Sequence, residues 1–494
     1  MIYSSQARTL IFIWLVLLIS VGNNFLLAKS NTSIEAFRSY LDETVPSLMA
    51  QYEIPGVAIA VIRGGELTWS GAYGYNNLAL RQKTQISSIF RVESISKSLT
   101  SWGVMRLVEK NQIDLDKPLQ QYLKNWQFPS SGYNLKAITV RQLLSHNSGL
   151  FLGTIGPGME YTPGAELPPL REVMSQEVQL IQKPGSGFNY SNAGFNLLEL
   201  LIEEVTGLSF ADYMNGEILR PLGMMRSGFE LNKSLEPLVP TGYDLHGQPV
   251  AAYVYPTHGA GGLLSPVEDI AQFVIAEMTG KYFVDHGVLS EMTIRQLHEP
   301  QIDVSGVFGF VADAYGLGHF IEQLPDGRRA VWHGGQGHGW MSHFHIVPES
   351  GNGIVILTNS QRSWPLFAHV LIDWAQWSGI GSVKMGKIVY AGITLRVLIS
   401  VLLLIILWQF FRFVRSIRNG NCRWSPLSVF SNYRRMLQLF SGLVIILALT
   451  WNMTNSYSIV SAVFPDLAEL FETSILTLSA MMIVSAMMSS KLKQ

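Results

Sequence analysis

The chain of 494 residues has only one cysteine, Cys422. No intramolecular disulfide can form, and residues 1–421 offer no thiol for nucleophilic catalysis or for a cysteine-based metal site. Outside the cytoplasm, a domain formed by this part of the chain must depend on its hydrophobic core alone.

Charge of one sign is not in excess either, because 35 Lys and Arg residues balance 36 Asp and Glu residues. Bulk electrostatics therefore do not favour a nucleic-acid partner or a strongly charged substrate. The sequence also has no internal repeat and no low-complexity segment. Its length predicts one catalytic unit of roughly 350 residues with accessory segments.

Residues 1–30 have the pattern of an export signal. Arg8 precedes an apolar run at 10–21, and the small residues Ala28 and Ser30 offer a cleavage site. An uncleaved N-terminal anchor is the alternative. Cleavage is the favoured interpretation, because the run is shorter than the roughly 20 residues that span a membrane comfortably.

Three apolar runs near the C-terminus, at 388–411, 436–458 and 470–489, predict transmembrane helices. They follow residues 31–379, which we call the catalytic part. A buried hairpin of core helices is the alternative, since the second and third runs are short. Arg396 lies in the first run near its outer end, where a long side chain reaches the membrane surface, so we do not interpret it as functional.

The charges between these runs predict an orientation. The loop 412–435 is rich in arginine and has no acidic residue, whereas the segment 452–474 has acidic residues and no Lys or Arg. The C-terminal tail carries Lys491 and Lys493. The positive-inside rule places the arginine-rich loop and the tail in the cytoplasm, so residues 31–379 lie in the periplasm, anchored to the inner membrane.

Between the two ends the sequence has the composition of a mixed α and β protein. Runs at 56–63 and 353–358 are typical of strands, and 96–110 and 193–206 carry apolar residues at helical intervals.

The first motif that carries chemistry is Ser94-Ile95-Ser96-Lys97. Extended residues precede Ser94 and a helical pattern starts there, so Lys97 is predicted one turn later on the same face. A helix N-terminus favours negative charge on the hydroxyl, and a desolvated amine beside it can accept the proton. A helix cap followed by a surface lysine is the ordinary alternative.

The second motif lies in the glycine-rich loop 183–192. In an extended segment, Tyr190 and Asn192 face the same cleft and supply a phenol for proton transfer and an amide for binding. A core tyrosine and an asparagine helix cap are the alternative interpretation.

The third motif is the glycine-rich segment 332–339, which precedes a predicted hairpin of strands 340–347 and 353–358. Its glycines allow the backbone to approach a ligand closely. A zinc site could instead use the histidines of this region, which are His333, His338, His343 and His345. No HExxH spacing or nearby carboxylate pair supports that site, so no metal is expected.

These motifs, in this order, resemble the serine β-lactamase and penicillin-binding family, specifically its class C, peptidase S12 branch. The resemblance covers about residues 35–375 and includes the segments 138–150, 219–224, 261–265 and 315–318. It implies an α/β (α+β) fold of the β-lactamase/transpeptidase type. Such a fold has an antiparallel sheet flanked by helices and a helical subdomain, followed here by three transmembrane helices.

The resemblance also implies roles for single residues. Ser94 is the acylated nucleophile, Lys97 is its partner, and Tyr190 and Asn192 form the Tyr-x-Asn motif. The oxyanion hole is formed by the backbone N–H groups of Ser94 and Gln336.

Two departures from the family pattern are informative. Glu93 stands where the family often has a small residue. His333, Gly334 and Gly335 replace Lys-Thr-Gly and, with Gln336, are expected to bind substrate. A largely neutral imidazole holds a substrate carboxylate less well than a lysine does. The replacement argues against an efficient β-lactamase and weakens a D-alanyl-D-alanine carboxypeptidase hypothesis.

An exported domain of this type followed by three spans is similar to the prodrug-activating peptidases of nonribosomal-peptide pathways, the colibactin-maturing type. Those enzymes remove an N-acyl-D-asparagine leader outside the inner membrane, and their His-Gly-Gly-Gln string matches residues 333–336. The similarity implies that Asn192, His258 and Gln336 bind the leader. It predicts a small peptide or acylated peptide substrate and export machinery as partners, without cofactor or nucleic acid.

Two other functions are compatible with the motifs. One is a cell-wall D-amino-acid peptidase or esterase of the same fold. The other is a β-lactam sensor that signals through its helices. A sensor should lack a deacylating base and precede a signalling domain, so the presence of Tyr190 and the short cytoplasmic segments argue against it.

Overall fold

The computed structural model describes residues 33–153, 159–231, 238–420, 422–454 and 459–490. The predicted export signal at 1–30 lies outside the described residues.

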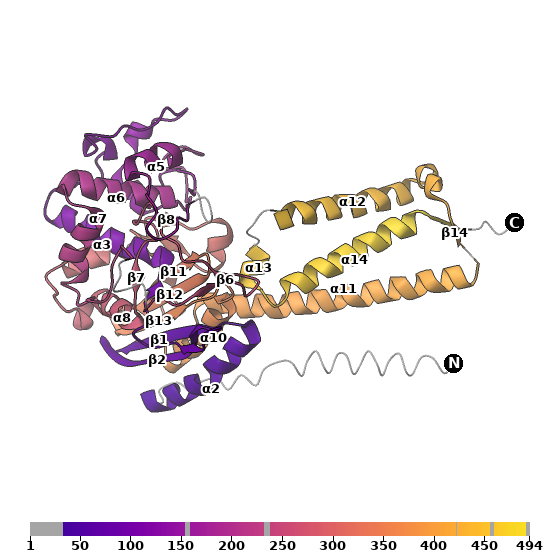
Figure 1. Cartoon of the computed structure of the whole chain (residues 1–494), viewed down its shortest axis with the longest axis horizontal. Helices are drawn as coiled ribbons and strands as arrows, with labels where there is room; N and C mark the ends of the chain where they lie inside the picture. The colour runs from indigo at the N-terminus through magenta and orange to yellow at the C-terminus, as the bar shows by residue number, and fades with distance from the viewer. Residues whose placement is uncertain (1–32, 154–158, 232–237, 421, 455–458, 491–494) are drawn as a thin grey trace.

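A nine-stranded antiparallel sheet is the centre of the catalytic part (Figure 1). Its strands, in spatial order, are β3 (Gln82–Lys83), β2 (Glu66–Asn77), β1 (Gly56–Arg63), β13 (Asn352–Thr358), β12 (Trp340–Val347), β11 (Arg329–Gly337), β10 (Phe320–Gln323), β9 (Ala314–Tyr315) and β8 (Ile302–Asp303). The strands from the two ends of the catalytic sequence thus pair at the centre, where β1 lies beside β13.

Helices cover both faces of this sheet, and strand β1 shows why. Its residues Ala58, Ala60 and Ile62 belong to one hydrophobic cluster, whereas Val57 and Ile59 belong to the other. Successive side chains of a strand point to opposite faces, so a strand buried on both faces is apolar throughout.

One face packs against α2 (Ile34–Tyr52) and α10 (Trp364–Trp377), and the other packs against α8 (Val267–Ala276). Beyond α8 lies a helical subdomain whose central pair is α3 (Ser96–Glu109) and α6 (Asn192–Thr206). The smaller elements around them are β4 (Phe90–Arg91), α4 (Val140–Leu144), α5 (Leu170–Glu177), α7 (Phe210–Met214), β5 (Gly242–Tyr243), β6 (Pro249–Val250), β7 (Leu264–Ser265) and α9 (Glu291–Leu297).

The antiparallel sheet with a helical subdomain confirms the predicted fold class. The strand at 56–63 is found as predicted, and the strand at 353–358 begins one residue earlier, at Asn352. The two predicted helices are α3 and α6, each shifted by one residue at one end.

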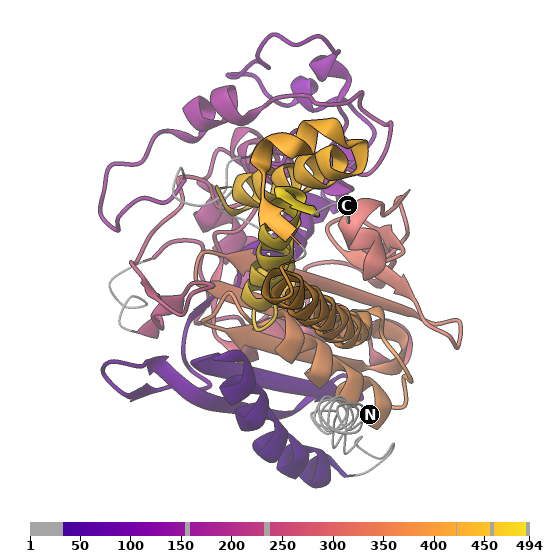
Figure 2. The same cartoon turned by 90° about the vertical axis from the view of Figure 1, so that its right-hand side faces the viewer.

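Among the described residues, three C-terminal helices are long and apolar enough to cross a membrane: α11 (Lys387–Arg418), α12 (Tyr433–Thr454) and α14 (Ala468–Ala486). Figure 1 shows α11 projecting from the catalytic part, and Figure 2 looks along this projection. Helix α14 contacts both α11 and α12, and the short α13 (Ile459–Val463) precedes it.

The first of these helices extends into the predicted arginine-rich segment 412–435. Helix α11 does not end at residue 411 but continues to Arg418, so Arg412 and Arg415 lie on the helix. At 32 residues it is about 48 Å long, more than the hydrocarbon core of a bilayer requires. The chain then forms β14 (Cys422–Trp424), which pairs with β15 (Met488–Ser490) after α14.

Arg396 on α11 is not a free cation that only reaches for the membrane surface. Its guanidinium donates to the carboxylate of Asp466 at 2.8 Å, just before α14. An ion pair satisfies both charges near the junction with the catalytic part and joins two of the apolar helices.

Candidate active site

Ser94 lies in a single 3₁₀ turn, Glu93–Ile95, between β4 and helix α3. The regular helix begins at Ser96, as the apolar pattern at 96–110 predicts, and Ser94 lies in the turn before it rather than in its first turn. The Ser96 hydroxyl donates to the Glu93 carbonyl at 2.6 Å and accepts from the Leu263 N–H at 3.0 Å. These bonds fix the turn, so half-buried Ser94 is held at the N-terminal end of α3.

Glu93 adopts the left-handed backbone conformation, with φ of 50°. This region is unfavourable for a residue with a side chain, at a cost of order 1–3 kcal/mol. The strain is a physical reason for the small residue that the resemblance implies at this position, and the carboxylate of Glu93 is held by Tyr253 and Tyr255.

Lys97 is fully buried, and its ammonium group reaches Ser94 as predicted. Nζ donates to Ser94 Oγ at 2.9 Å and to the Ala260 carbonyl at 2.7 Å. Burial lowers the pKa of Lys97 to about 7, although the nearby Glu93 charge opposes this shift. A substantial fraction of the amine is therefore neutral at physiological pH and can accept a proton.

Tyr190 completes this group. Its ring centroid lies 5.0 Å from Lys97 Nζ, and its phenol is hydrogen-bonded with the Ser94 hydroxyl. Burial raises the pKa of Tyr190, and the bond with Ser94 only partly offsets the shift. The phenol thus keeps its proton at neutral pH and can pass it on along the Ser94 hydroxyl.

Asn192 is not part of the extended segment that the sequence suggested. It is the first residue of α6, and the helix cap is Ser191, whose hydroxyl accepts from Gly194 N–H at 3.1 Å. The Asn192 backbone N–H donates to the Leu152 carbonyl at 2.7 Å. Its half-buried side chain therefore projects from the first turn of a helix rather than alternating with Tyr190 along a strand.

His333 is fully buried on β11, and both of its ring nitrogens have partners in the protein. Nδ1 lies 2.8 Å from the Gly334 carbonyl, so it carries the proton, and Nε2 accepts from the Tyr315 hydroxyl at 3.1 Å. Burial and the nearby Lys97 charge hold the pKa of His333 well below its usual range. The expected direct contact of this imidazole with substrate is therefore not available in this structure, and the ring is a neutral support for the strand.

The glycines of β11 allow this strand to pass against the nucleophile turn. A Cβ atom on Gly335 would lie 2.2 Å from the Val92 carbonyl oxygen, and one on Gly337 would lie 2.3 Å from the Glu93 carboxyl carbon. At Gly334 the nearest atom would be 3.4 Å away, an ordinary contact. Close backbone approach is thus required at Gly335 and Gly337 but not at Gly334.

Gln336 lies on the part of β11 that β10 no longer covers, since β10 pairs only with residues 329–332. Leu324 N–H donates to the Arg328 carbonyl at the turn between β10 and β11, so Arg328 directs its backbone groups toward β10. Backbone groups alternate in direction along a strand, so the even-numbered residues of β11 also direct theirs toward the β10 side. The Gln336 N–H consequently points to an edge that is free for a ligand carbonyl. Its side-chain Oε1 accepts from Trp364 Nε1 at 3.1 Å.

The Glu93 carboxylate is buried behind this strand between two tyrosines. The hydroxyls of Tyr253 and Tyr255 lie 3.3 Å and 3.2 Å from its oxygens. Burial raises the pKa of Glu93 to about 7, although the Arg91 charge and both phenols favour the ionised form. The carboxylate therefore shares its environment with Lys97, and the protonation of each depends on the other.

His258 lies on the loop that supplies the Ala260 carbonyl to Lys97. Its Nδ1 is 3.2 Å from buried Glu199, whose carboxylate also accepts from the N–H groups of His258 and Gly259 at 2.6 and 2.7 Å. Burial would lower the pKa of His258, but the bond to Glu199 and its charge raise it. These contacts hold the loop in place, and a role of His258 in substrate binding stays a prediction.

The histidines considered for a zinc site do not converge. His338 binds Glu160 through Nδ1 at 3.0 Å, on the side of the strand near Tyr253. His343 and His345 lie beside each other on β12, with Nε2 of the first 3.4 Å from Nδ1 of the second.

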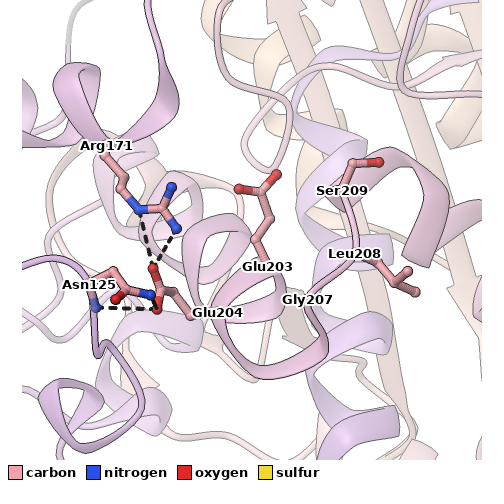
Figure 3. A pocket seen from close by; sticks show the side chains of 7 residues that line it. All are labelled: Asn125, Arg171, Glu203, Glu204, Gly207, Leu208 and Ser209. Carbon is pink, nitrogen blue, oxygen red and sulfur yellow. Dashed lines mark hydrogen bonds and ion pairs between the residues drawn. The ribbon is translucent and has the colours of Figure 1, made fainter.

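One solvent-facing cavity lies far from this chemistry (Figure 3). It has a volume of about 350 Å³ and is lined by Asn125, Arg171, Glu203, Glu204, Gly207, Leu208 and Ser209. It is located at the C-terminal end of α6, whose 15 residues place it roughly 20 Å from Tyr190. Its polar groups bind one another, as Arg171 does Glu204 at 2.6 Å, so it is not part of the site.

Sequence reasoning missed several side chains that build the site. His146 packs on Tyr190 with ring centroids 4.2 Å apart, and its Nδ1 accepts from Ser191 N–H at 3.1 Å. Tyr315 positions His333. Both residues lie in segments that carry the family resemblance, at 138–150 and 315–318. Their position in these segments was the signal that could have identified them as site residues.

Comparison with known proteins agrees with this geometry. The Beta-lactamase family matches residues 41–370. Protein flp of Staphylococcus aureus strain MRSA252 is 24% identical over 326 residues, which cover 65% of this chain and 62% of that protein. Unguisins hydrolase ungD' of Aspergillus campestris is 26% identical over 368 residues, which cover 68% of this chain and 64% of that protein. The chain thus spans less than two thirds of the length of these two relatives.

Among solved structures, the octameric penicillin-binding protein homologue from Pyrococcus abyssi superimposes with a TM-score of 0.57 at 28% identity. The similarity covers 68% of this chain and 76% of that one. With the family match over most of the chain and a serine, lysine and tyrosine in mutual contact, the protein belongs to the Beta-lactamase family of serine hydrolases.

Proposed function

We propose that this protein is a membrane-anchored serine amidohydrolase that forms an acyl-enzyme on Ser94 and removes an N-acyl-D-amino-acid leader, D-Asn-like, from a nonribosomal-peptide prodrug. The observation that carries the acyl-enzyme is the 2.9 Å contact of Lys97 Nζ with Ser94 Oγ, combined with a lysine pKa of about 7.

In the acylation step, neutral Lys97 takes the proton of Ser94 while Oγ attacks the amide carbonyl carbon of the substrate. The carbonyl π electrons move onto its oxygen, which becomes the oxyanion. We assign the oxyanion hole to the backbone N–H groups of Ser94 and Gln336, and the free edge of β11 supports this assignment.

Collapse of the tetrahedral intermediate breaks the C–N bond and needs a proton on the leaving amine. Tyr190 is hydrogen-bonded with Ser94 and lies over Lys97, so it can deliver a proton to that nitrogen and recover one from Lys97. Water then attacks the ester carbonyl, with the same groups acting in reverse, and releases the acyl product.

The neutral charge of the buried His333 side chain supports the leader hypothesis. The ring is neutral, fully buried and bonded at both nitrogens, so no cation stands where relatives with Lys-Thr-Gly would hold a substrate carboxylate. An amide-bearing acyl group does not require such a cation.

The three apolar helices and the charges between them support the proposed location. With α11, α12 and α14 in the inner membrane and the arginine-rich segment in the cytoplasm, Ser94 would act in the periplasm on an exported precursor. The Aspergillus relative is named as a hydrolase of unguisins, which supports a hydrolytic function for this chain.

The test uses the purified full-length protein in detergent micelles with two matched substrates, an N-acyl-D-asparaginyl anilide and its L-enantiomer. Product release is followed by liquid chromatography and mass spectrometry. We expect the D-substrate to be cleaved roughly 100-fold faster in kcat/KM, because a site shaped for one enantiomer leaves polar groups of the other unpaired. Ser94→Ala is the control, which should release no product.

Faster cleavage of an N-acyl-D-alanyl-D-alanine peptide than of the asparaginyl anilide would instead support the cell-wall peptidase. Stable labelling by a fluorescent penicillin without turnover of any substrate would support the sensor. Either outcome leaves Ser94 as the nucleophile and contradicts the leader hypothesis.

A further inference from the structure

A second cluster of titratable side chains lies beside helix α3, away from Ser94. Glu277 follows α8, His298 follows α9, and His319 lies in the loop before β10. All three are buried, and one ligand atom of each lies within 4.8 Å of the others. Three elements distant in sequence thus direct two imidazoles and a carboxylate to one point.

The hydrogen bonds of His319 leave one of its ring nitrogens facing Glu277 without a hydrogen bond. Its Nδ1 lies 3.1 Å from the Leu317 carbonyl and must donate to it, so in the neutral ring Nε2 is a lone pair. That nitrogen faces Glu277 Oε1 at 3.3 Å and has no hydrogen-bond partner in the described residues. Two buried acceptors face each other stably only with a cation between them.

The surrounding contacts are those of a metal site. A ligating histidine usually donates its other ring N–H to a carbonyl or carboxylate, as His319 does to Leu317. The Glu277 carboxylate accepts in addition from Trp102 Nε1 on α3 and contacts His298 Nε2. The three groups are therefore oriented from outside as well as brought together.

We propose that Glu277, His298 and His319 bind a divalent transition-metal ion of the zinc class. Two imidazole nitrogens and one carboxylate suit zinc and exclude a preference for magnesium or calcium, which take oxygen ligands. A water molecule would complete the tetrahedron.

The metal would stabilise the packing of the loop before β10 against helix α3, which carries Lys97. Gly318, next to His319, donates its N–H to the Leu144 carbonyl at 2.9 Å and accepts from the Ser98 hydroxyl at 2.8 Å. A Cβ on Gly318 would lie 1.9 Å from Ser101 Oγ, so the loop backbone lies directly against α3. The ion would thus support the helix that carries Lys97 without touching the substrate.

The same residues could instead form an ion pair in which a proton on His319 replaces the metal. Metal content distinguishes the two, measured on full-length protein purified in detergent without chelator. We expect about one equivalent of zinc per chain by elemental mass spectrometry. Replacement by Co²⁺ should give the visible absorption of a tetrahedral ion, and His298→Ala and His319→Ala should each lose the metal. His345→Ala, at another fully buried histidine, is the matched control and should retain it.

Because these variants could unfold, the wild-type protein provides the second measurement. A chelator such as dipicolinate should lower Tm by several degrees, and added zinc should restore it. A wild-type protein that contains no metal, acquires none from added Zn²⁺ and has a Tm unaffected by chelator would overturn the proposal in favour of the ion pair.

Discussion

At the scale of single residues, the site depends on two buried groups whose pKa values are shifted in opposite directions, in each case toward the neutral form. Burial lowers the pKa of Lys97 to about 7 and raises that of Glu93 to about 7. The unfolded chain binds more protons at Lys97 between pH 7 and its ordinary value of 10.5, so this residue makes the free energy of unfolding rise with pH across that range. The lysine therefore costs stability at neutral pH and supplies a base in return.

The pH dependence of activity should follow Lys97. Below about pH 7, kcat/KM should fall about tenfold per pH unit, because only the neutral amine accepts the Ser94 proton. Since the Glu93 charge raises the pKa of Lys97, Glu93→Gln should move this acidic limb to lower pH. Steady-state kinetics from pH 5 to 9 measure the shift.

Glu349→Gln, which removes an exposed carboxylate remote from the site, is the control and should leave the profile unchanged. A Glu93→Gln limb at unchanged or higher pH would show that Glu93 does not act on Lys97.

At the scale of elements, the sequence predicted what depends on local pattern and missed what depends on packing between segments. The period of apolar residues located β1, α3 and α6 almost to the residue. No pattern indicated that Glu93 would lie behind β11 between Tyr253 and Tyr255, because those residues are more than 150 positions apart and meet only in the folded chain.

The same distinction explains the errors. The 3₁₀ turn at Glu93–Ile95 has the local appearance of a helix start, and only the positive φ of Glu93 separates it from α3. Asn192 follows Tyr190 by two residues as in a strand, but Ser191 caps α6 and turns the chain into a helix there.

At the scale of elements, two glycines of strand β11 can be compared, because only one of them lies close to the nucleophile turn. Gly335→Ala would place Cβ 2.2 Å from the Val92 carbonyl and displace the strand from the nucleophile turn. We expect kcat/KM to fall on the order of 100-fold, because a shift of about 1 Å in a catalytic geometry has that effect. Gly334→Ala, with its nearest contact at 3.4 Å, is the matched control and should lose far less. Equal losses in the two variants would contradict the predicted role of Gly335.

At the scale of the whole molecule, a hydrolase domain is joined to three long apolar helices, most of whose residues are not buried. Figure 1 shows that these helices project from the domain. Helix α10 contacts both α2 of the catalytic part and α11, and Arg396 and Asp466 form an ion pair close to this junction. The catalytic part is thus held at a defined position relative to the helices rather than by a free linker.

The single cysteine of the chain makes the proposed orientation testable without a reporter fusion. Cys422 lies in the segment between α11 and α12 that we expect in the cytoplasm. A membrane-impermeant maleimide should leave it unlabelled in intact spheroplasts and label it after permeabilisation, as scored by mass shift on a gel. Lys281→Cys in a Cys422→Ser background is the control on the catalytic part and should label in intact spheroplasts. Labelling of Cys422 in intact spheroplasts would reverse the orientation.

The central claim is that Ser94, activated by Lys97, is the nucleophile. Its most direct test is covalent capture by a fluorophosphonate, with the modified residue located by peptide mass spectrometry on the full-length protein. We predict one modified serine, Ser94, with labelling abolished in Ser94→Ala and slowed at least 100-fold in Lys97→Ala at pH 7. Modification of another residue, or full substrate turnover by Ser94→Ala, would contradict the account.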